Sequence, residues 1–182
     1  MCVLIYKPKG KNLPSYETMK ACCYANPHGF GFVTMDGYRY RTMDEKKFLN
    51  ELYKNVKTED EVMVHCRLAT HGSKRVANCH PFKFNDVCFA HNGILDIKPF
   101  KDKTDSETAF ISILYPAIEK YGIHSEELKK EVNNIIGCSK FCIFDTKLKV
   151  ARIFGDYTSY EGCYFSNTRF KSYIRRAYEF CF

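Results

Sequence analysis

The run Cys2-Val3-Leu4-Ile5-Tyr6 follows Met1 directly and predicts a buried β-strand at the start of the fold. A small residue at position 2 permits an aminopeptidase to remove Met1. Removal would leave Cys2 with a thiol and a free α-amine, whose reference pKa is about 7.7–8.0. Such an amine accepts a proton near neutral pH, so one residue would carry both a nucleophile and its base. The alternative is that Cys2 is an ordinary small hydrophobic residue that begins a strand.

The first third of the chain predicts a helix, a hairpin and a second helix. Ser15–Tyr24 is expected to be helical and to end before Pro27, because proline disfavours helical geometry in the residue that precedes it. Asp36-Gly37 predicts a two-residue hairpin turn between the strands on either side of it. Asp44 suits the N-cap of a helix with one apolar stripe: Phe48, Leu49, Leu52, Tyr53 and Val56.

Two apolar segments further along the chain end in polar, glycine-containing loops. Val62–Arg67 and Val87–His91 predict buried strands, and polar loop residues at strand ends are common sites of chemistry. A helix is expected from Thr104, with a kink at Pro116. One more helix (around 128–136) and three strands (141–144, 150–154 and 163–165) complete the pattern. Antiparallel strands before and after central helices predict an α+β fold, in which helices cover two sheets.

Length and composition favour a single domain over residues 1–182, from which Met1 is removed. The chain is 45% hydrophobic and carries a net charge of +7. Its basic residues are scattered, so nucleic acid is not an expected partner. No stretch approaches the ~20 apolar residues that span a bilayer, and no membrane association is expected. Since no signal peptide is recognisable, the ten cysteines indicate a reducing, cytoplasmic location.

Cofactor and metal sites are not expected from the spacing of the residues that would form them. Five residues that commonly bind zinc fall in one stretch, but none forms a pair with the usual ligand spacing: Cys66, His71, Cys79, His80 and His91. Gly29-Phe30-Gly31 lacks the third glycine and the following helix of a dinucleotide-binding fingerprint.

Four loops, taken together with Cys2, resemble the class II glutamine amidotransferases. These N-terminal-nucleophile (Ntn) hydrolases have a glutaminase domain that begins with a processed cysteine. The loops follow in the family's order: Asn26–Gly31, Arg67–Gly72, His91–Gly93 and Thr104–Glu107. The similarity extends from Cys2 to about Phe165 and implies a stand-alone glutaminase-type domain. The implied fold has four layers, αββα, with two antiparallel sheets between helices.

Arg67 begins the first of the motifs that carry the resemblance, R-x-A-T-H-G. Its planar fork of donors suits a bidentate grip on a carboxylate, and the family uses this arginine to hold the α-carboxylate of glutamine. Thr70, His71 and Gly72 are expected to shape and line the same substrate pocket, or to form only a tight turn. Without these neighbours, Arg67 would be interpreted as a surface ion-pair residue.

Asn92 and Gly93 form the second motif, H-N-G. In the family, the asparagine amide and the glycine N–H hold the oxyanion that develops during catalysis. Preorganised donors of this kind contribute about 10²–10³ each to the rate. The alternative is an ordinary turn dipeptide at the end of a strand.

Asp105 lies in the third motif, where Thr104 and Glu107 also form a capping box at the start of a helix. The family's matching aspartate binds the α-amino group of glutamine, so Arg67 and Asp105 together would select an α-amino acid. His28, Gly29 and Gly31 resemble the glycine-rich turn beside the nucleophile and are possible pocket residues.

The resemblance implies release of ammonia from glutamine through a thioester on Cys2, with a separate synthase subunit or acceptor enzyme as a possible partner. Three departures stand against a full match: Val3 replaces a glycine, Leu68 replaces an aromatic residue, and no synthase segment follows. Two alternatives remain open. One is a γ-glutamyl hydrolase that acts on a larger conjugate, and the other is a catalytically silent binding module.

Overall fold

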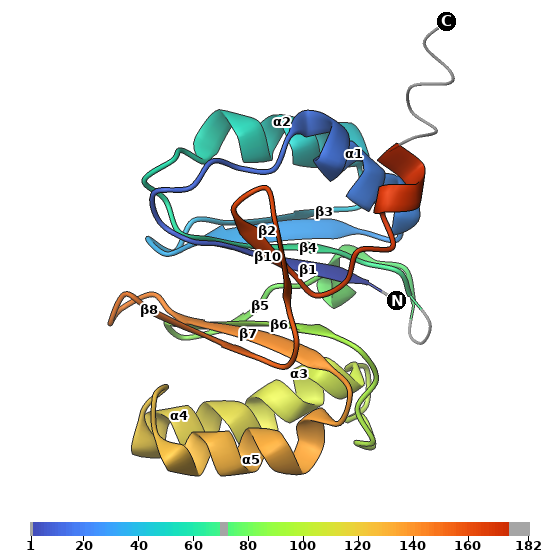
Figure 1. Cartoon of the computed structure of the whole chain (residues 1–182). Helices are drawn as coiled ribbons and strands as arrows, with labels where there is room; N and C mark the ends of the chain where they lie inside the picture. Colours follow the sequence, from blue (N-terminus) through green and yellow to red (C-terminus); the bar gives the residue numbers. More distant parts are fainter. Residues whose placement is uncertain (1, 70–72, 175–182) are drawn as a thin grey trace, which may run out of the picture.

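Two antiparallel sheets lie between two layers of helices in the computed structural model (Figure 1). The structure describes residues 2–69 and 73–174. The predicted α+β class is confirmed, and so is the αββα order of the layers.

The larger sheet contains both the first and the last strand of the described chain. Its strands, in sequence order, are β1 (Val3–Lys7), β2 (Phe30–Thr34), β3 (Arg39–Thr42), β4 (Val62–Cys66), β9 (Thr158–Tyr160) and β10 (Cys163–Phe165). They are arranged in the order β3-β2-β4-β1-β10-β9, with every neighbouring pair antiparallel. The first strand therefore lies inside the sheet, between β4 and β10, which fixes the position of Cys2.

The smaller sheet is a meander of four strands. They are β5 (Phe82–Phe84), β6 (Val87–Asn92), β7 (Lys140–Asp145) and β8 (Val150–Phe154), and they pair in sequence order. The two short strands β5 and β9 were not expected from the sequence. Both have only three residues, too few to show a period of alternation.

Helices α1 (Tyr16–Ala25) and α2 (Glu45–Asn55) cover the larger sheet, and α3 (Asp105–Ala109), α4 (Tyr115–Tyr121) and α5 (Glu126–Ile136) cover the smaller one (Figure 1). The cap expected at Asp44 is present, since its side chain accepts a backbone N–H group of α2. Ser15, which was expected inside the first helix, is instead the N-cap of α1. The kink expected at Pro116 takes the form of a π-helical segment, Phe110–Leu114, between α3 and α4.

The hairpin at Asp36-Gly37 is confirmed, but the prediction of a two-residue turn is wrong. Thr34 N–H donates to the carbonyl of Tyr38 at 3.0 Å, which leaves Met35, Asp36 and Gly37 as a three-residue loop. Gly37 has φ of +96°, a conformation that glycine adopts readily and that closes loops of this length.

Side chains alternate along the strands and so form three apolar layers. Val3 and Ile5 pack toward α1 and α2, whereas Leu4 packs between the sheets with Met63 of β4. The alternation places His65 between the sheets as well, and its Nε2–H donates to the carbonyl of His91 on β6 at 3.2 Å. The layer between the sheets thus changes from apolar to polar where β4 approaches its end.

Candidate active site

Cys2 lies beside the residues that follow β4, because β1 pairs with β4 and places Val3 opposite Cys66. The Leu68 N–H donates to Cys2 Sγ at 3.3 Å, and Sγ lies 3.6 Å from the Leu68 carbonyl oxygen. Burial raises the pKa of the Cys2 thiol, and the Leu68 N–H opposes this effect only in part. The thiol is therefore protonated at neutral pH, so a nucleophilic reaction of Cys2 requires a base.

Arg67 is held in place by its backbone. Its N–H donates to the carbonyl of Gly29 at 2.8 Å, and its own carbonyl accepts from the N–H of His28 at 2.9 Å. The side chain is only 5% exposed, and Nη1 donates to the carbonyl of Ser73 at 3.1 Å. A buried guanidinium fixed in this way is well suited to bind a carboxylate.

Asp105 is the first residue of α3, and Thr104 caps the helix by accepting from the Glu107 N–H at 3.1 Å. The carboxylate of Asp105 accepts from the N–H of Leu95 at 3.0 Å and from the N–H of Ser106 at 2.8 Å. These two bonds fix the carboxylate at the helix start.

His91 extends this hydrogen-bonded group. The Ser106 hydroxyl donates to Asp105 Oδ1 at 3.2 Å, so Nδ1 of His91, at 2.8 Å from the same hydroxyl, must be the donor to it. Nε2 of His91 is then an acceptor, and it is buried with no hydrogen-bond partner among the described residues. Burial lowers the pKa of His91 to about 4, against the opposing effect of Asp105.

Asn92 ends β6, and Gly93 follows it. Gly93 has φ of +148°, and a Cβ at this position would come within 2.1 Å of Ser139 Oγ, so only glycine fits. The Asn92 side chain is 3% exposed, and its Nδ2 lies 2.8 Å from Ser166 Oγ.

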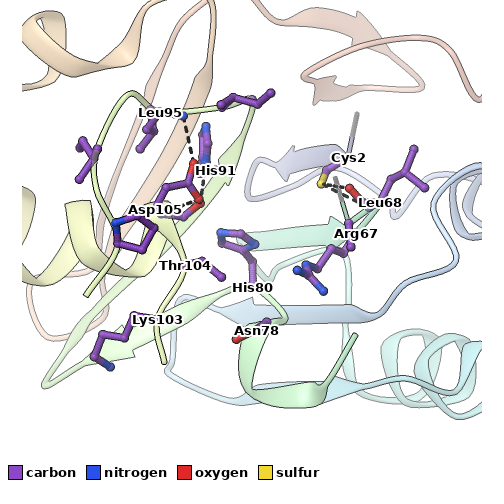
Figure 2. Close-up of a pocket in the computed structure, with 16 residues that line it drawn as sticks. Cys2, Arg67, Leu68, Asn78, His80, His91, Leu95, Lys103, Thr104 and Asp105 are labelled. Carbon is purple, nitrogen blue, oxygen red and sulfur yellow. Dashed lines mark hydrogen bonds between the residues drawn. The ribbon is translucent and has the colours of Figure 1, made fainter. Parts of the chain in front are cut away.

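Four of the residues singled out from the sequence line one cavity of about 300 Å³: Cys2, Arg67, Gly93 and Asp105. Figure 2 shows Cys2 and Arg67 on one side of it, with His91 and Asp105 on the other. His80 lies between them, and an apolar wall is formed by Ile94, Leu95, Ile97 and Pro99. Asn92 is adjacent to the lining residue Gly93 but is not itself part of the lining. Thr70, His71 and Gly72 lie outside the described residues.

His28, Gly29 and Gly31 do not line this cavity. A Cβ on Gly29 would lie 2.3 Å from Cys79 Sγ, and one on Gly31 would lie 2.3 Å from the carbonyl oxygen of His80. The glycines therefore let the segment that carries His80 approach β2. His28 Nδ1 accepts from the N–H of Ala69 at 3.1 Å and so holds the chain just beyond Leu68.

Three buried histidines lie close together at the cavity: His80 and His91 line it, and the ring of His65 lies 4.4 Å from that of His80. Burial lowers the pKa of His65 to about 3 and that of His80 well below its usual range, as it does for His91. All three are therefore neutral at physiological pH. In the part of the chain that the structure describes, no group of three His, Cys, Asp or Glu residues is arranged to hold a metal ion.

Ser166 and Asn167 contact residues of the site but were not predicted as site residues from the sequence. They follow β10 directly, and Asn167 Nδ2 donates to the carbonyl of Cys2 at 2.7 Å. Both are polar residues at the end of a strand, which is the signal that drew attention to Arg67. The basic tail that follows them shows no clear hydrophobic period, so the end of the strand could not be recognised from the sequence.

A family model described as class-II glutamine amidotransferases matches residues 24–138, which is more than half of the chain. The chain belongs to this family. The matched residues include Arg67, Asn92, Gly93 and Asp105.

Two relatives illustrate the extent of the similarity. A probable glutamine amidotransferase of Saccharomyces cerevisiae, DUG3, is 31% identical over 93 residues, which cover 42% of this chain and 26% of the yeast protein. The glutamine phosphoribosylpyrophosphate amidotransferase of B. subtilis, solved with ADP and GMP, matches with a TM-score of 0.58 and 16% identity. That match covers 96% of this chain and 44% of the other. The chain thus spans less than half of the length of either relative, and the similarity to the B. subtilis enzyme supports the fold alone.

Within residues 2–69 and 73–174, no helix combines the length and the apolar character needed to cross a membrane.

Proposed function

We propose that this amidotransferase releases ammonia from the side chain of glutamine, with Cys2 as the N-terminal nucleophile. Removal of Met1 frees the α-amine of Cys2, which takes the thiol proton as sulfur attacks the side-chain carbonyl carbon. The tetrahedral intermediate collapses as the protonated amine returns this proton to the leaving nitrogen. Ammonia departs and a thioester remains on Cys2. Water, deprotonated by the same amine, then cleaves the thioester to glutamate and restores the thiol.

Arg67 and Asp105 bind the two charged groups of the substrate in this proposal. The guanidinium donates hydrogen bonds to the α-carboxylate, and the carboxylate of Asp105 accepts hydrogen bonds from the α-ammonium group. Asn92 and the Gly93 N–H stabilise the oxyanion of the intermediate. The observation that carries the proposal is that one cavity collects Cys2, Arg67, Gly93 and Asp105, although they come from four separate segments of the chain.

A direct test measures ammonia and glutamate release from glutamine by the parent, Cys2→Ala and Cys138→Ala proteins. Cys138 is an exposed free cysteine that does not line the cavity, and it serves as the control. We expect activity in the parent and in Cys138→Ala, and none in Cys2→Ala. Intact mass should show a chain that begins at Cys2. Full activity in Cys2→Ala, or in a protein that retains Met1, would contradict the mechanism.

A γ-glutamyl conjugate larger than glutamine is the second candidate substrate. The observation that favours it is the apolar wall of Ile94, Ile97 and Pro99, for which the polar groups of free glutamine offer no partner. Comparison of kcat/KM for glutamine and for γ-glutamyl anilide distinguishes the two. A higher value for the anilide supports the conjugate, and a higher value for glutamine supports the first proposal.

A parent that binds either compound without turnover would instead be a silent binding module. Purification of the chain from its host, followed by identification of the proteins that co-purify with it, tests for a separate enzyme that accepts the ammonia.

A further inference from the structure

Ser166 ties three distant parts of the chain together behind the cavity. Its N–H donates to the carbonyl of Leu4 at 2.9 Å, and its Oγ accepts from the N–H of Leu4 at 2.9 Å. Leu4 and Ser166 are 162 residues apart in the sequence. The neighbouring Asn167 fixes the Cys2 carbonyl at 2.7 Å. The position of the Ser166 hydroxyl is therefore set by the same strand that carries the nucleophile.

The Ser166 hydroxyl contacts the side-chain amide of Asn92, and the orientation of this amide decides which of its two polar atoms faces away from Ser166. With Nδ2 toward Ser166 at 2.8 Å, the hydroxyl oxygen accepts from both Asn92 and Leu4. Its own proton then has no acceptor among the described residues. Asn92 Oδ1 is also buried without a hydrogen-bond partner in the described part of the chain. This orientation leaves two buried polar groups unpaired, each of which costs free energy.

The opposite orientation of the amide pairs these two groups with each other and leaves only Nδ2 without a partner among the described residues. When the amide is turned by a half rotation, the Ser166 hydroxyl donates to Oδ1 and still accepts from Leu4. Oxygen and nitrogen of an amide have nearly the same shape, so the rotation requires no repacking. Nδ2 then replaces Oδ1 at the unpartnered position, with both of its N–H groups available to a ligand.

We infer that Ser166 is a positioning residue that holds Asn92 with its Nδ2 available to the oxyanion. This inference rests on the proposed function, because the oxyanion is that of the glutamine carboxamide. Ser166 itself touches no reacting atom. Its hydroxyl selects one of two amide orientations and thereby turns a buried side chain into a donor. Misplacement of a catalytic group by about 1 Å costs roughly 10²-fold in rate, which sets the scale of the expected effect.

The first arm of the test is a double-mutant cycle in kcat with glutamine. Ser166→Ala should lower kcat by about 10²-fold and leave KM within about threefold, because substrate binding by Arg67 and Asp105 is unaffected. The double variant Ser166→Ala/Asn92→Ala should be no slower than Asn92→Ala alone, since Ser166 acts through Asn92. Additive losses in kcat, or an unchanged kcat in Ser166→Ala, would overturn the inference.

Ser125→Ala is the matched control for stability. Ser125 Oγ also makes two hydrogen bonds, to Gly122 and Leu128 at the start of α5, far from the cavity. It should lose a similar amount of stability without a change in kcat.

The second arm does not depend on activity. Neutron diffraction from deuterated crystals of the parent locates the deuterons on Ser166 and Asn92. The inference requires the Ser166 deuteron to point at Asn92 Oδ1, and a deuteron of Nδ2 directed at Ser166 would overturn it. A parent without activity toward glutamine would refute the proposed function, while the neutron result would still decide the orientation of the amide.

Discussion

The layer between the two sheets has an apolar end and a polar end, which differ in what they contribute. The apolar end contains Leu4, Met63, Cys88 and Phe144, all with no exposed surface. The polar end, at the cavity, contains His65, Arg67, His80, His91 and Asn92. Met63, His65 and Arg67 lie at every second position along the same segment. One alternating pattern thus supplies both ends, and only the residue type changes.

This change of residue type has a cost in stability. Six buried side-chain atoms have no hydrogen-bond partner among the described residues, and five of them belong to His65, His80, His91 and Asn92 at the polar end. Unpaired buried polar atoms destabilise a fold, so they are typical of sites kept for a ligand. The comparison indicates that the apolar end stabilises the protein, whereas the polar end is adapted to chemistry.

The largest effect on this comparison is expected from Phe144→Ala at the apolar end. Loss of a fully buried phenylalanine should lower the free energy of unfolding by about 3–5 kcal/mol, measured by urea denaturation. kcat/KM below the transition should stay within about threefold. Phe84→Ala is the control, because Phe84 is 44% exposed and makes one edge-to-face contact, with Tyr115, worth about 1 kcal/mol. A large fall in kcat without loss of stability would refute the division between the two ends.

Asn92→Ala at the polar end should show the opposite behaviour. Loss of one oxyanion donor should lower kcat by about 10²–10³-fold, or about 2.7–4 kcal/mol, with a smaller effect on KM. The matched control is Asn26→Ala, since Asn26 is also buried and also has one side-chain amide atom without a partner among the described residues, but lies outside the cavity lining. If Asn92→Ala loses stability in proportion to its activity, Asn92 is only a turn residue.

Most of the fold could be predicted because local signals decide it. The N-caps Asp44 and Thr104 were expected at the starts of helices, and the structure confirms both. The predicted strands 62–67 and 87–91 match β4 and β6 to within one residue at either end. The length of the turn at Gly37 was wrong, because Asp-Gly suits both two-residue and three-residue loops.

The site was less accessible to prediction because distant segments form it. The sequence motifs indicated Cys2, Arg67, Gly93 and Asp105, which do line the cavity. The motifs gave no indication that Ser166 would contact Asn92, since that contact depends on the pairing of β1 with β10. The roles of His28, Gly29 and Gly31 also depended on packing, because their neighbours Cys79 and His80 come from a segment far along the chain.

The smallest effect is expected from the pH dependence of stability. The pKa of His65 is lowered to about 3 and that of His91 to about 4, chiefly by burial. Each histidine is neutral in the fold but becomes charged in the unfolded chain below its ordinary pKa of about 6.5. Its contribution to stability is therefore complete above pH 6.5 and is lost as the pH falls toward the folded pKa, by about 1.4 kcal/mol per pH unit.

Urea denaturation between pH 7.5 and 5 measures this slope. His65→Gln should make it shallower by about 1.4 kcal/mol per pH unit, whatever its effect on stability at pH 7.5. His124→Gln, at an exposed histidine, is the control and should leave the slope unchanged. Equal slopes in the parent and in His65→Gln would show that His65 is not held neutral by the polar end.

The central claim is that Cys2 reacts with a substrate whose charged groups are bound by Arg67 and Asp105. The most direct measurement is the rate at which 6-diazo-5-oxo-norleucine, an electrophilic glutamine analogue, labels Cys2 in the parent, Arg67→Ala and Asp105→Ala proteins. Iodoacetamide, which has neither charged group, is the control reagent and should label Cys2 at similar rates in all three. We predict that the analogue labels Cys2 in the parent and at least about tenfold more slowly in either variant, because each variant leaves one charge of the analogue without its partner. Equal labelling rates with the analogue in all three proteins would contradict the account.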